Sequence, residues 1–253
     1  MPGYRTALVR LFTIQAAFSY ERMLGVGFGF AAEPLLRELA RRGDASGAEP
    51  GAAAAPRFRA ALARQSRYFN AHPYLAALAV GAAARAEVEG EPPERIERLR
   101  AALTGPLGSL GDRLIWAGWL PACAAVGLLL VTLGAGGWAV AAFLLLYNAL
   151  HLWLRAWGLK VGWRCGVDVA GALAAPVLQR ALELVAPLAA VALGAALPAV
   201  LDWYPFAAHW ELLAGAAAAG LFAVVAGAFQ GRATGLVVAA AALTAVVAVG
   251  VLW

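Results

Sequence analysis

The feature that most constrains this chain is a series of long segments without a charged residue in its second half. Five such segments of 17 to 20 residues occur, at 114–133, 138–154, 184–201, 213–229 and 235–253. About 20 apolar residues are needed for an α-helix to cross the hydrocarbon core of a bilayer. Only 14% of the 253 residues are charged, against about a quarter in soluble domains. The sequence therefore predicts an all-α integral membrane protein with about five transmembrane helices.

The positive charges fall on one side of the membrane if these five segments alternate in direction. With a cytoplasmic N-terminus, the inside regions 1–113, 155–183 and 230–234 hold 15, 4 and 1 of the 20 Lys and Arg residues. Cytoplasmic loops normally carry such an excess. We therefore predict a cytoplasmic N-terminus and a C-terminus on the outer, periplasmic side. This topology also accounts for the net charge of +5, so we expect no nucleic-acid partner.

Residues 1–113 differ from the rest because they hold 26 of the 35 charged residues. Their apolar runs, within 8–30 and 69–84, are too short to span a bilayer and suit core helices or re-entrant helices that enter the membrane and return. Re-entrant backbone must be covered by protein or line a water-filled path. We therefore predict two regions. Residues 1–113 form a cytoplasmic-side region with amphipathic and re-entrant helices and the substrate motifs, and residues 114–253 form a transmembrane helical bundle.

A first group of polar residues lies in the segment 8–39, which we expect to be helical. Polar groups in apolar sequence are informative because burying one without a partner costs several kcal/mol. On a helix, Gln15, Ser19 and Arg22 would share one face at the spacing i, i+4 and i+7, and Glu21 would point elsewhere. The group is either a binding face or a set of structurally paired or solvated side chains.

A second group is Asn70, His72 and Pro73, at the start of the apolar run 69–84. Proline disfavours helical backbone at His72, which predicts an extended or turn conformation suited to a substrate loop. The alternative is a helix start capped by Asn70. A third group, the glycine-rich sequence GPLGSLGD at 105–112, ends on Asp112, which we expect to cap the helix 114–133.

A fourth group lies near the end of the segment 138–154, where Asn148 and His151 precede Gly158, Gly162 and Gly166. Small residues at every fourth position let helices approach closely. The spacing is therefore typical of tight helix packing.

Motifs for catalysis are missing from the sequence. It has no H-E-x-x-H, no C-x-x-C and no Walker lysine, so we expect no metal, no cofactor and no ATPase activity. An intramembrane enzyme would need an acid–base pair, such as His72 and Asp112, within reach of each other. That alternative is open to a structural test.

Together these motifs resemble those of the IID membrane component of mannose-family sugar phosphotransferase systems. The resemblance covers about residues 8–168. It is carried by Gln15 with SYERM at 19–23 and Gly27-Phe28, by FNAHPY at 69–74, and by GPLGSLGD at 105–112 with Trp116. Further along, the matching residues in order are Asn148, Arg155, Gly158, Gly162 and Gly166.

The resemblance implies a non-catalytic subunit of a sugar-phosphorylating transport complex in a bacterial cytoplasmic (inner) membrane. Such a subunit pairs with a IIC membrane partner to form the translocation unit, and several pairs assemble into a larger oligomer. The sugar is phosphorylated by a cytoplasmic IIB subunit, which receives its phosphate from IIA. No phosphohistidine is therefore expected on this chain.

The resemblance also implies the substrate-binding residues, and we expect Glu21 and Asn70 to contact sugar hydroxyls because carboxylates and amides offer paired hydrogen-bonding sites. Three positions depart from the family pattern: Ser19 stands where Asn is usual, Leu24 where Gln is usual, and Arg113 where Pro follows the Asp. The alternative function is accordingly a regulatory or scaffold membrane protein that keeps the fold but moves no sugar. The candidate substrate-binding residues are Gln15, Ser19, Glu21, Asn70, His72 and Asp112.

Overall fold

Three helical segments in the described part of the chain are long and apolar enough to cross a membrane, and they carry the first three predicted spans. They are Pro93–Thr132, Gly137–Asp168 and Ala170–Ala196. The structure, a computed structural model, describes residues 1–44, 54–174 and 176–203. The predicted spans at 213–229 and 235–253 lie outside these residues. The structure thus supports an all-α fold with three candidate spans among the residues that it describes.

The helices before the first candidate span are shorter, and the spans themselves are composite. One continuous helical run consists of α5, the π-helical η1 and α6, so that it passes without a break through residue 113, where the sequence changes from charged to apolar. The elements in chain order are α1 (Tyr4–Leu11), α2 (Gly25–Asp44), α3 (Ala54–Gln65), α4 (Ala76–Glu89), α5 (Pro93–Gly111), η1 (Asp112–Trp119), α6 (Leu120–Thr132), α7 (Gly137–Cys165), η2 (Gly166–Asp168), α8 (Ala170–Leu173) and α9 (Pro176–Trp203).

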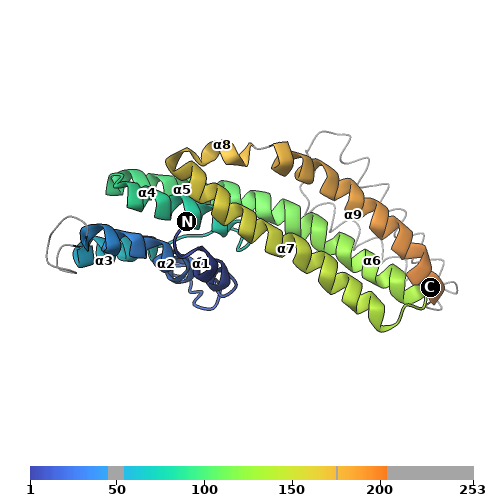
Figure 1. Ribbon diagram of the computed structural model, residues 1–253. Helices are drawn as coiled ribbons and strands as arrows, with labels where there is room; N and C mark the ends of the chain where they lie inside the picture. Colours follow the sequence, from blue (N-terminus) through green and yellow to red (C-terminus); the bar gives the residue numbers. More distant parts are fainter. Residues whose placement is uncertain (45–53, 175, 204–253) are drawn as a thin grey trace.

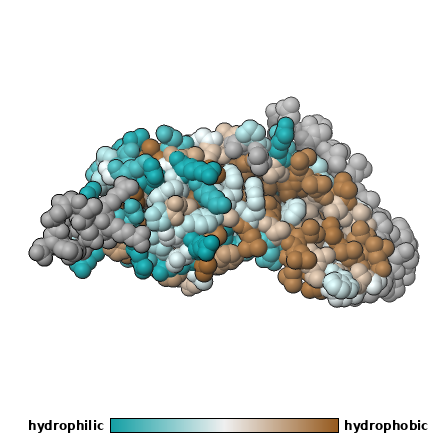
Figure 2. Space-filling model, in the orientation of Figure 1, coloured by the Kyte–Doolittle hydropathy of each residue, from teal (hydrophilic) through white to brown (hydrophobic). Residues whose placement is uncertain are grey.

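The molecule is elongated, with a polar end and an apolar end. Helices α1 to α4 gather at one end, and α6, α7 and α9 run side by side toward the other (Figure 1). Hydrophilic residues cover the first end and hydrophobic residues the second (Figure 2). Trp138 and Leu145 on α7 and Val191 on α9 are 81%, 72% and 72% exposed. Apolar side chains that stand out from the protein in this way suit a lipid surrounding rather than water.

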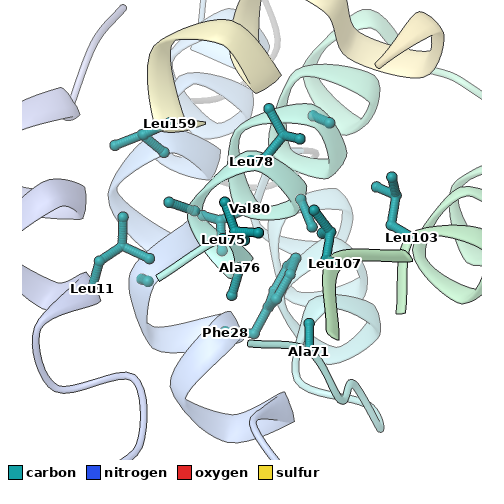
Figure 3. Close-up of a cluster of buried hydrophobic side chains, with 14 of the residues drawn as sticks. Leu11, Phe28, Ala71, Leu75, Ala76, Leu78, Val80, Leu103, Leu107 and Leu159 are labelled. Carbon is teal, nitrogen blue, oxygen red and sulfur yellow. The ribbon is translucent and has the colours of Figure 1, made fainter. Parts of the chain in front are cut away.

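Helix α4 forms the centre of the polar end. Twelve of its 14 residues are buried, and α2, α5 and α7 all pack against it. Leu11, Phe28, Leu78, Leu107 and Leu159 converge around it from four other elements and from α4 itself (Figure 3). A helix that is buried on every side belongs to a protein core. Most of the apolar run 69–84 is therefore a helix covered by protein, and its entry into the membrane stays a prediction.

The contact between α4 and α7 depends on glycine, as the spacing in α7 predicts. A Cβ atom on Gly162 would lie 2.0 Å from the carbonyl oxygen of Leu78, and one on Gly81 would lie 2.5 Å from the carbonyl oxygen of Leu159. Real side chains never come so close, so the two backbones touch only because both positions lack Cβ. The third glycine of the series, Gly166, has a φ of +53° and ends α7 instead.

The prediction of one helix over 8–39 is wrong. Residues 12–24 are a folded-back segment between α1 and α2, with a tight turn in which Ser19 and Met23 exchange backbone hydrogen bonds. The Ser19 side chain accepts a hydrogen bond from the Arg22 N–H, a local bond that competes with helix formation. A Cβ on Gly27 would lie 1.9 Å from the Ile14 carbonyl oxygen, so the segment packs directly on the first turn of α2. Gln15, Ser19 and Arg22 consequently do not share a helix face.

The expected cap at Asp112 is also wrong. Because α5 continues through η1 into α6, Asp112 lies inside a continuous helix and its side chain makes no capping hydrogen bond. The start of α5 at Pro93 agrees with the preference of proline for the first helical turn.

Candidate functional site

A recess of about 410 Å³ lies where the segment 66–75 meets the C-terminal half of α5. It brings together Asn70, His72 and Asp112, which the sequence places in two motifs about 40 residues apart. Its size falls within the usual range of ligand pockets, about 300–1,000 Å³. The lining residues are Asn70, Ala71, His72, Pro73, Thr104, Gly105, Gly108, Ser109 and Asp112.

The three glycines of the GPLGSLGD motif have two different roles. In the part of the chain that the structure describes, a Cβ added to Gly105 or Gly108 would meet nothing within 4 Å, so these residues leave open space in the recess. A Cβ on Gly111 would instead lie 2.1 Å from the His72 Cβ and 2.2 Å from its Cγ. The absence of a side chain at 111 therefore allows His72 to pack against the helix that forms the opposite wall.

The segment 66–75 is held in place by the N-terminal motif. The Leu24 N–H donates to the Phe69 carbonyl oxygen at 2.9 Å, and the Phe69 N–H donates to the Arg22 carbonyl oxygen at 3.3 Å. The Phe69 ring lies 4.7 Å from the Phe28 ring. The segment 19–24 thus supports the residue that immediately precedes Asn70.

Gln15, Ser19 and Glu21 themselves do not line the recess. All three lie in the segment 12–24, and the Glu21 side chain is 83% exposed, with its carboxylate 3.8 Å from the Arg22 Nε atom. The structure therefore brings together three of the six predicted site residues and leaves the other three on the supporting segment.

Arg100 anchors the other end of the same segment. Its side chain is buried and donates from Nη1 to the Arg64 carbonyl oxygen at 2.6 Å, and from Nη2 to the carbonyl oxygens of Gln65 and Arg67 at 3.2 and 3.1 Å. These carbonyls belong to the end of α3, where helical partners are lacking. Arg100 therefore holds the start of the segment 66–75 in place.

His72 is the most enclosed polar residue of the recess. It is 2% exposed, its Nδ1 accepts a hydrogen bond from the Tyr74 N–H at 3.3 Å, and its Nε2 has no hydrogen-bond partner among the described residues. Since Nδ1 accepts, the proton of the neutral ring is on Nε2. Burial lowers the pKa of His72 to about 4, against a smaller raising effect of Asp112. The ring is therefore neutral at pH 7 and keeps one unused N–H donor.

The alternative role of Asn70 as a helix cap is not supported. Helix α4 begins with a backbone bond, in which the Ala76 N–H donates to the His72 carbonyl oxygen at 2.9 Å, and no side chain caps its first turn. Asn70 is exposed and lines the recess, so its amide is free to meet a ligand.

A layer of aromatic and cationic side chains lies next to His72, and sequence reasoning did not assign it to the site. The Tyr74 hydroxyl is 2.6 Å from the Tyr147 hydroxyl. The Tyr74 ring stacks on the His151 ring, with 4.3 Å between the ring centres. Arg155 is 3% exposed, with its guanidinium 4.6 Å from the centre of the Tyr74 ring. Tyr147, His151 and Arg155 are spaced by four residues, so their shared helix face was the available signal.

Asp112 lies at the point where the helical wall changes geometry. It is the first residue of η1, in which the turns are widened, and the Leu120 N–H that follows donates to the carbonyl oxygen of Ile115, five residues earlier. Short π-helical segments within α-helices occur frequently at functional sites. His72 and Asp112 line the same recess, and no hydrogen bond joins their side chains among the described residues.

The lowered pKa of His72 predicts a pH-dependent stability. Between pH 6.5 and 4 the unfolded chain binds a proton at this residue and the folded chain does not, so the free energy of unfolding falls as the pH falls through this range. We expect a loss of about 2–3 kcal/mol over this range, since one unit of pKa difference between the folded and unfolded chains corresponds to about 1.4 kcal/mol. Thermal unfolding of the detergent-solubilised chain at several pH values measures it.

The variant His72→Gln provides the control for this prediction. Glutamine stays neutral throughout the range, so the variant lacks the part of the pH dependence that comes from His72, whatever its overall stability. An equal slope in the wild type and the variant would show that His72 binds its proton over the same pH range in the folded and unfolded chains, so that folding does not lower its pKa.

Comparison with known proteins gives a consistent result. Residues 3–204 match the model of the family described as "PTS system mannose/fructose/sorbose family IID component". The chain is 29% identical over 184 residues to the fructose permease IID component of Bacillus subtilis, covering 71% of this chain and 62% of that protein. It is 30% identical over 175 residues to the sorbose-specific EIID component of Klebsiella pneumoniae, covering 67% and 59%.

A mannose-specific EIID component of Escherichia coli K12 is 25% identical over 196 residues, or 76% of this chain and 65% of that protein. The chain thus spans about three fifths of the length of the curated relatives that it matches. Among solved structures, it resembles a chain of the mannose transporter ManYZ in complex with microcin E492. The TM-score is 0.56 and the identity 26%, over 76% of this chain and 68% of that one.

Proposed function

Because the chain belongs to the IID components of the mannose/fructose/sorbose family of phosphotransferase systems, we propose that it is the IID subunit of a sugar permease. In this proposal it forms the translocation unit with a IIC membrane partner, in an assembly of several such pairs. The substrate is a hexose-type sugar, which a cytoplasmic IIB subunit phosphorylates after receiving phosphate from IIA. The chain itself carries no phosphohistidine.

The observation that carries the proposal is the recess lined by Asn70, His72 and Asp112. The amide of Asn70 and the carboxylate of Asp112 together offer both donors and acceptors to neighbouring hydroxyl groups, and the buried ring of His72 forms part of the wall. Ser109 adds a hydroxyl, and the open positions at Gly105 and Gly108 leave room for a ring. Such a set of uncharged and singly charged polar groups suits a polyol better than an ionic ligand.

The three departures from the family pattern do not weaken this site. Leu24 is buried and contributes its backbone N–H to Phe69, and Ser19 forms the turn beside it. Arg113 is exposed and does not line the recess. Since the altered side chains lie outside the recess, the proposal favours a transporting subunit over a scaffold protein.

The proposal also assigns the two regions of the chain different tasks. Residues 1–113 lie on the cytoplasmic side of a bacterial inner membrane and hold the substrate residues, and residues 114–253 provide the scaffold and the surface for the IIC partner. The charged and apolar ends of the molecule support this division (Figure 2), as does the distribution of Lys and Arg along the sequence.

Uptake of labelled sugar tests the proposal. The chain is co-expressed with a candidate IIC partner, IIA and IIB in cells whose own mannose-family system is deleted. We expect phosphorylated sugar to accumulate only when both membrane subunits are present, because neither alone completes the translocation path. If the two subunits co-purify from the membrane but no member of a panel of hexoses is taken up, the scaffold function replaces transport.

A further inference from the structure

A basic recess lies away from the candidate sugar site, where α1 meets the last turns of α7. It has a volume of about 340 Å³ and is lined by Met1, Tyr4, Lys160, Trp163 and Arg164. The two elements are joined by the Tyr4 hydroxyl, which donates to the Ala156 carbonyl oxygen at 3.4 Å, and by Lys160, whose Nζ lies 5.4 Å from the centre of the Tyr4 ring. An adjoining recess of about 470 Å³ shares Met1 and Tyr4 and adds Arg5.

The cations of this recess lack counter-ions. Arginines at other positions pair with glutamate, such as Arg10 with Glu33 and Arg85 with Glu89. Within the described residues, no carboxylate forms an ion pair with Arg5, Lys160 or Arg164. The guanidinium of Arg85 lies over the Trp163 ring, 5.7 Å from the centre of the ring. Its charge is already compensated by Glu89. Lys160 and Arg164 line this recess and Arg5 lines the adjoining one, and no acidic residue lines either, so the surroundings fit an anion.

The position of the recess along α7 indicates the source of the anion, because it places the recess at the level of the lipid headgroups. The charge-free segment 138–154 is about 26 Å long at 1.5 Å per residue, against about 30 Å for the hydrocarbon core. Lys160 lies about 9 Å beyond Leu154 and Arg164 about 15 Å beyond it, so that both lie in or just past the headgroup layer, which is about 5–7 Å thick on each side. Tyr4 and Trp163 are the residue types that mark this layer.

We propose that this recess binds the phosphate of an anionic phospholipid headgroup. Arg164 supplies a fork that matches two phosphate oxygens, Lys160 supplies a point charge, and Trp163 supplies an indole N–H that has no partner in the described structure. Basic recesses at the ends of membrane-spanning helices are where lipid headgroups bind. The lipid would thus join α1 to the end of α7 without entering the sugar site.

The test is native mass spectrometry of the full-length chain in detergent, titrated with phosphatidylglycerol and, in parallel, with phosphatidylcholine of the same acyl chains. We expect saturable binding of phosphatidylglycerol and weaker binding of the zwitterionic lipid. In the double variant Lys160→Gln/Arg164→Gln the affinity should fall about 30-fold, because each basic residue near an anionic surface contributes about 1 kcal/mol and 1.4 kcal/mol corresponds to tenfold.

Two matched variants separate a built site from general attraction of charge. Arg57→Gln/Arg59→Gln removes the same number of charges from exposed positions on α3 and should leave binding unchanged. The exchange Lys160→Arg/Arg164→Lys keeps both charges but moves the guanidinium fork, and it should bind less tightly than the wild type and more tightly than the Lys160→Gln/Arg164→Gln variant. An equal loss in both Gln variants, or no loss in either, would overturn the site. Inorganic phosphate is added as a competitor: displacement of the lipid at millimolar phosphate would show a site for free phosphate and overturn the lipid assignment.

Discussion

Replacing Gly162 with alanine is expected to destabilise the chain by about 3 kcal/mol, the upper end of the range for overpacked cores. The new Cβ would lie 2.0 Å from the Leu78 carbonyl oxygen and 2.9 Å from the Ala82 nitrogen. Both atoms belong to the backbone of α4, which is enclosed on every side and has no room to retreat. For a chain of this length the midpoint of thermal unfolding should fall by about 6–12 °C, measured by circular dichroism in detergent.

Gly194→Ala is the matched control for this substitution. Gly194 lies within α9, and a Cβ there would meet no atom of the described residues within 4 Å. Alanine in a helix is favoured over glycine by about 0.5–1 kcal/mol, so this variant should be as stable as the wild type or slightly more so. If Gly162→Ala and Gly194→Ala unfold at the same temperature, then α4 and α7 do not cross as closely as in the structure.

This crossing is also a part of the fold that the sequence could predict. The spacing of Gly158, Gly162 and Gly166 indicates close packing, and the charge-free segments locate the helices of the apolar end, because both signals depend on neighbours along one helix. The partner of the glycines could not be predicted. It is α4, a helix whose apolar length suits a re-entrant segment as well as a core, and only the tertiary contacts identify its surroundings.

The segment 12–24 shows why a local pattern fails where a long-range contact decides the structure. Its apolar residues suit a helix, but the backbones of Arg22 and Leu24 form hydrogen bonds with Phe69, 45 or more positions away in the sequence. Gly27 then lets the segment lie directly on α2. A resemblance between sequences finds Gln15 and Glu21, which match the family motif, but does not distinguish a residue that contacts substrate from one whose neighbours support the substrate loop.

The sequence could predict three polar residues of the recess but not how they come together. Asn70, His72 and Asp112 each stand out as polar groups beside apolar sequence. Their meeting depends on the contact between Gly111 and His72, and on the continuity of α5 with α6, neither of which has a signal in the local sequence. The contact between Tyr74 and Arg155 beside the recess could not be predicted either, because the role of a helix face can be inferred only when the segment that packs against it is known.

The second large effect concerns transport. In cells that express the chain with candidate IIC, IIB and IIA subunits, Asn70→Ala and Asp112→Asn are each expected to lower the rate of sugar uptake by about tenfold to a hundredfold. Asn70→Ala deletes an amide and leaves its hydrogen-bonding partner on the sugar unsatisfied, which costs about 1–3 kcal/mol. Asp112→Asn replaces a charged acceptor oxygen by an NH2 donor, and a bond to a charged group contributes about 1.5–3 kcal/mol. Initial rates of labelled-sugar uptake measure the effect, normalised to the amount of the subunit in the membrane.

Two carboxylates outside the recess make this prediction specific. Glu94→Gln removes a charge from the first turn of α5, at an exposed position, and should leave uptake unchanged. Glu21→Gln is the sharper comparison, because Glu21 matches the family motif as Asp112 does but lies on the exposed turn. Uptake that survives Asp112→Asn and is lost in Glu21→Gln would move the substrate site from the recess to the segment 12–24. The reverse result would assign the sugar to the recess and leave the N-terminal motif as its support.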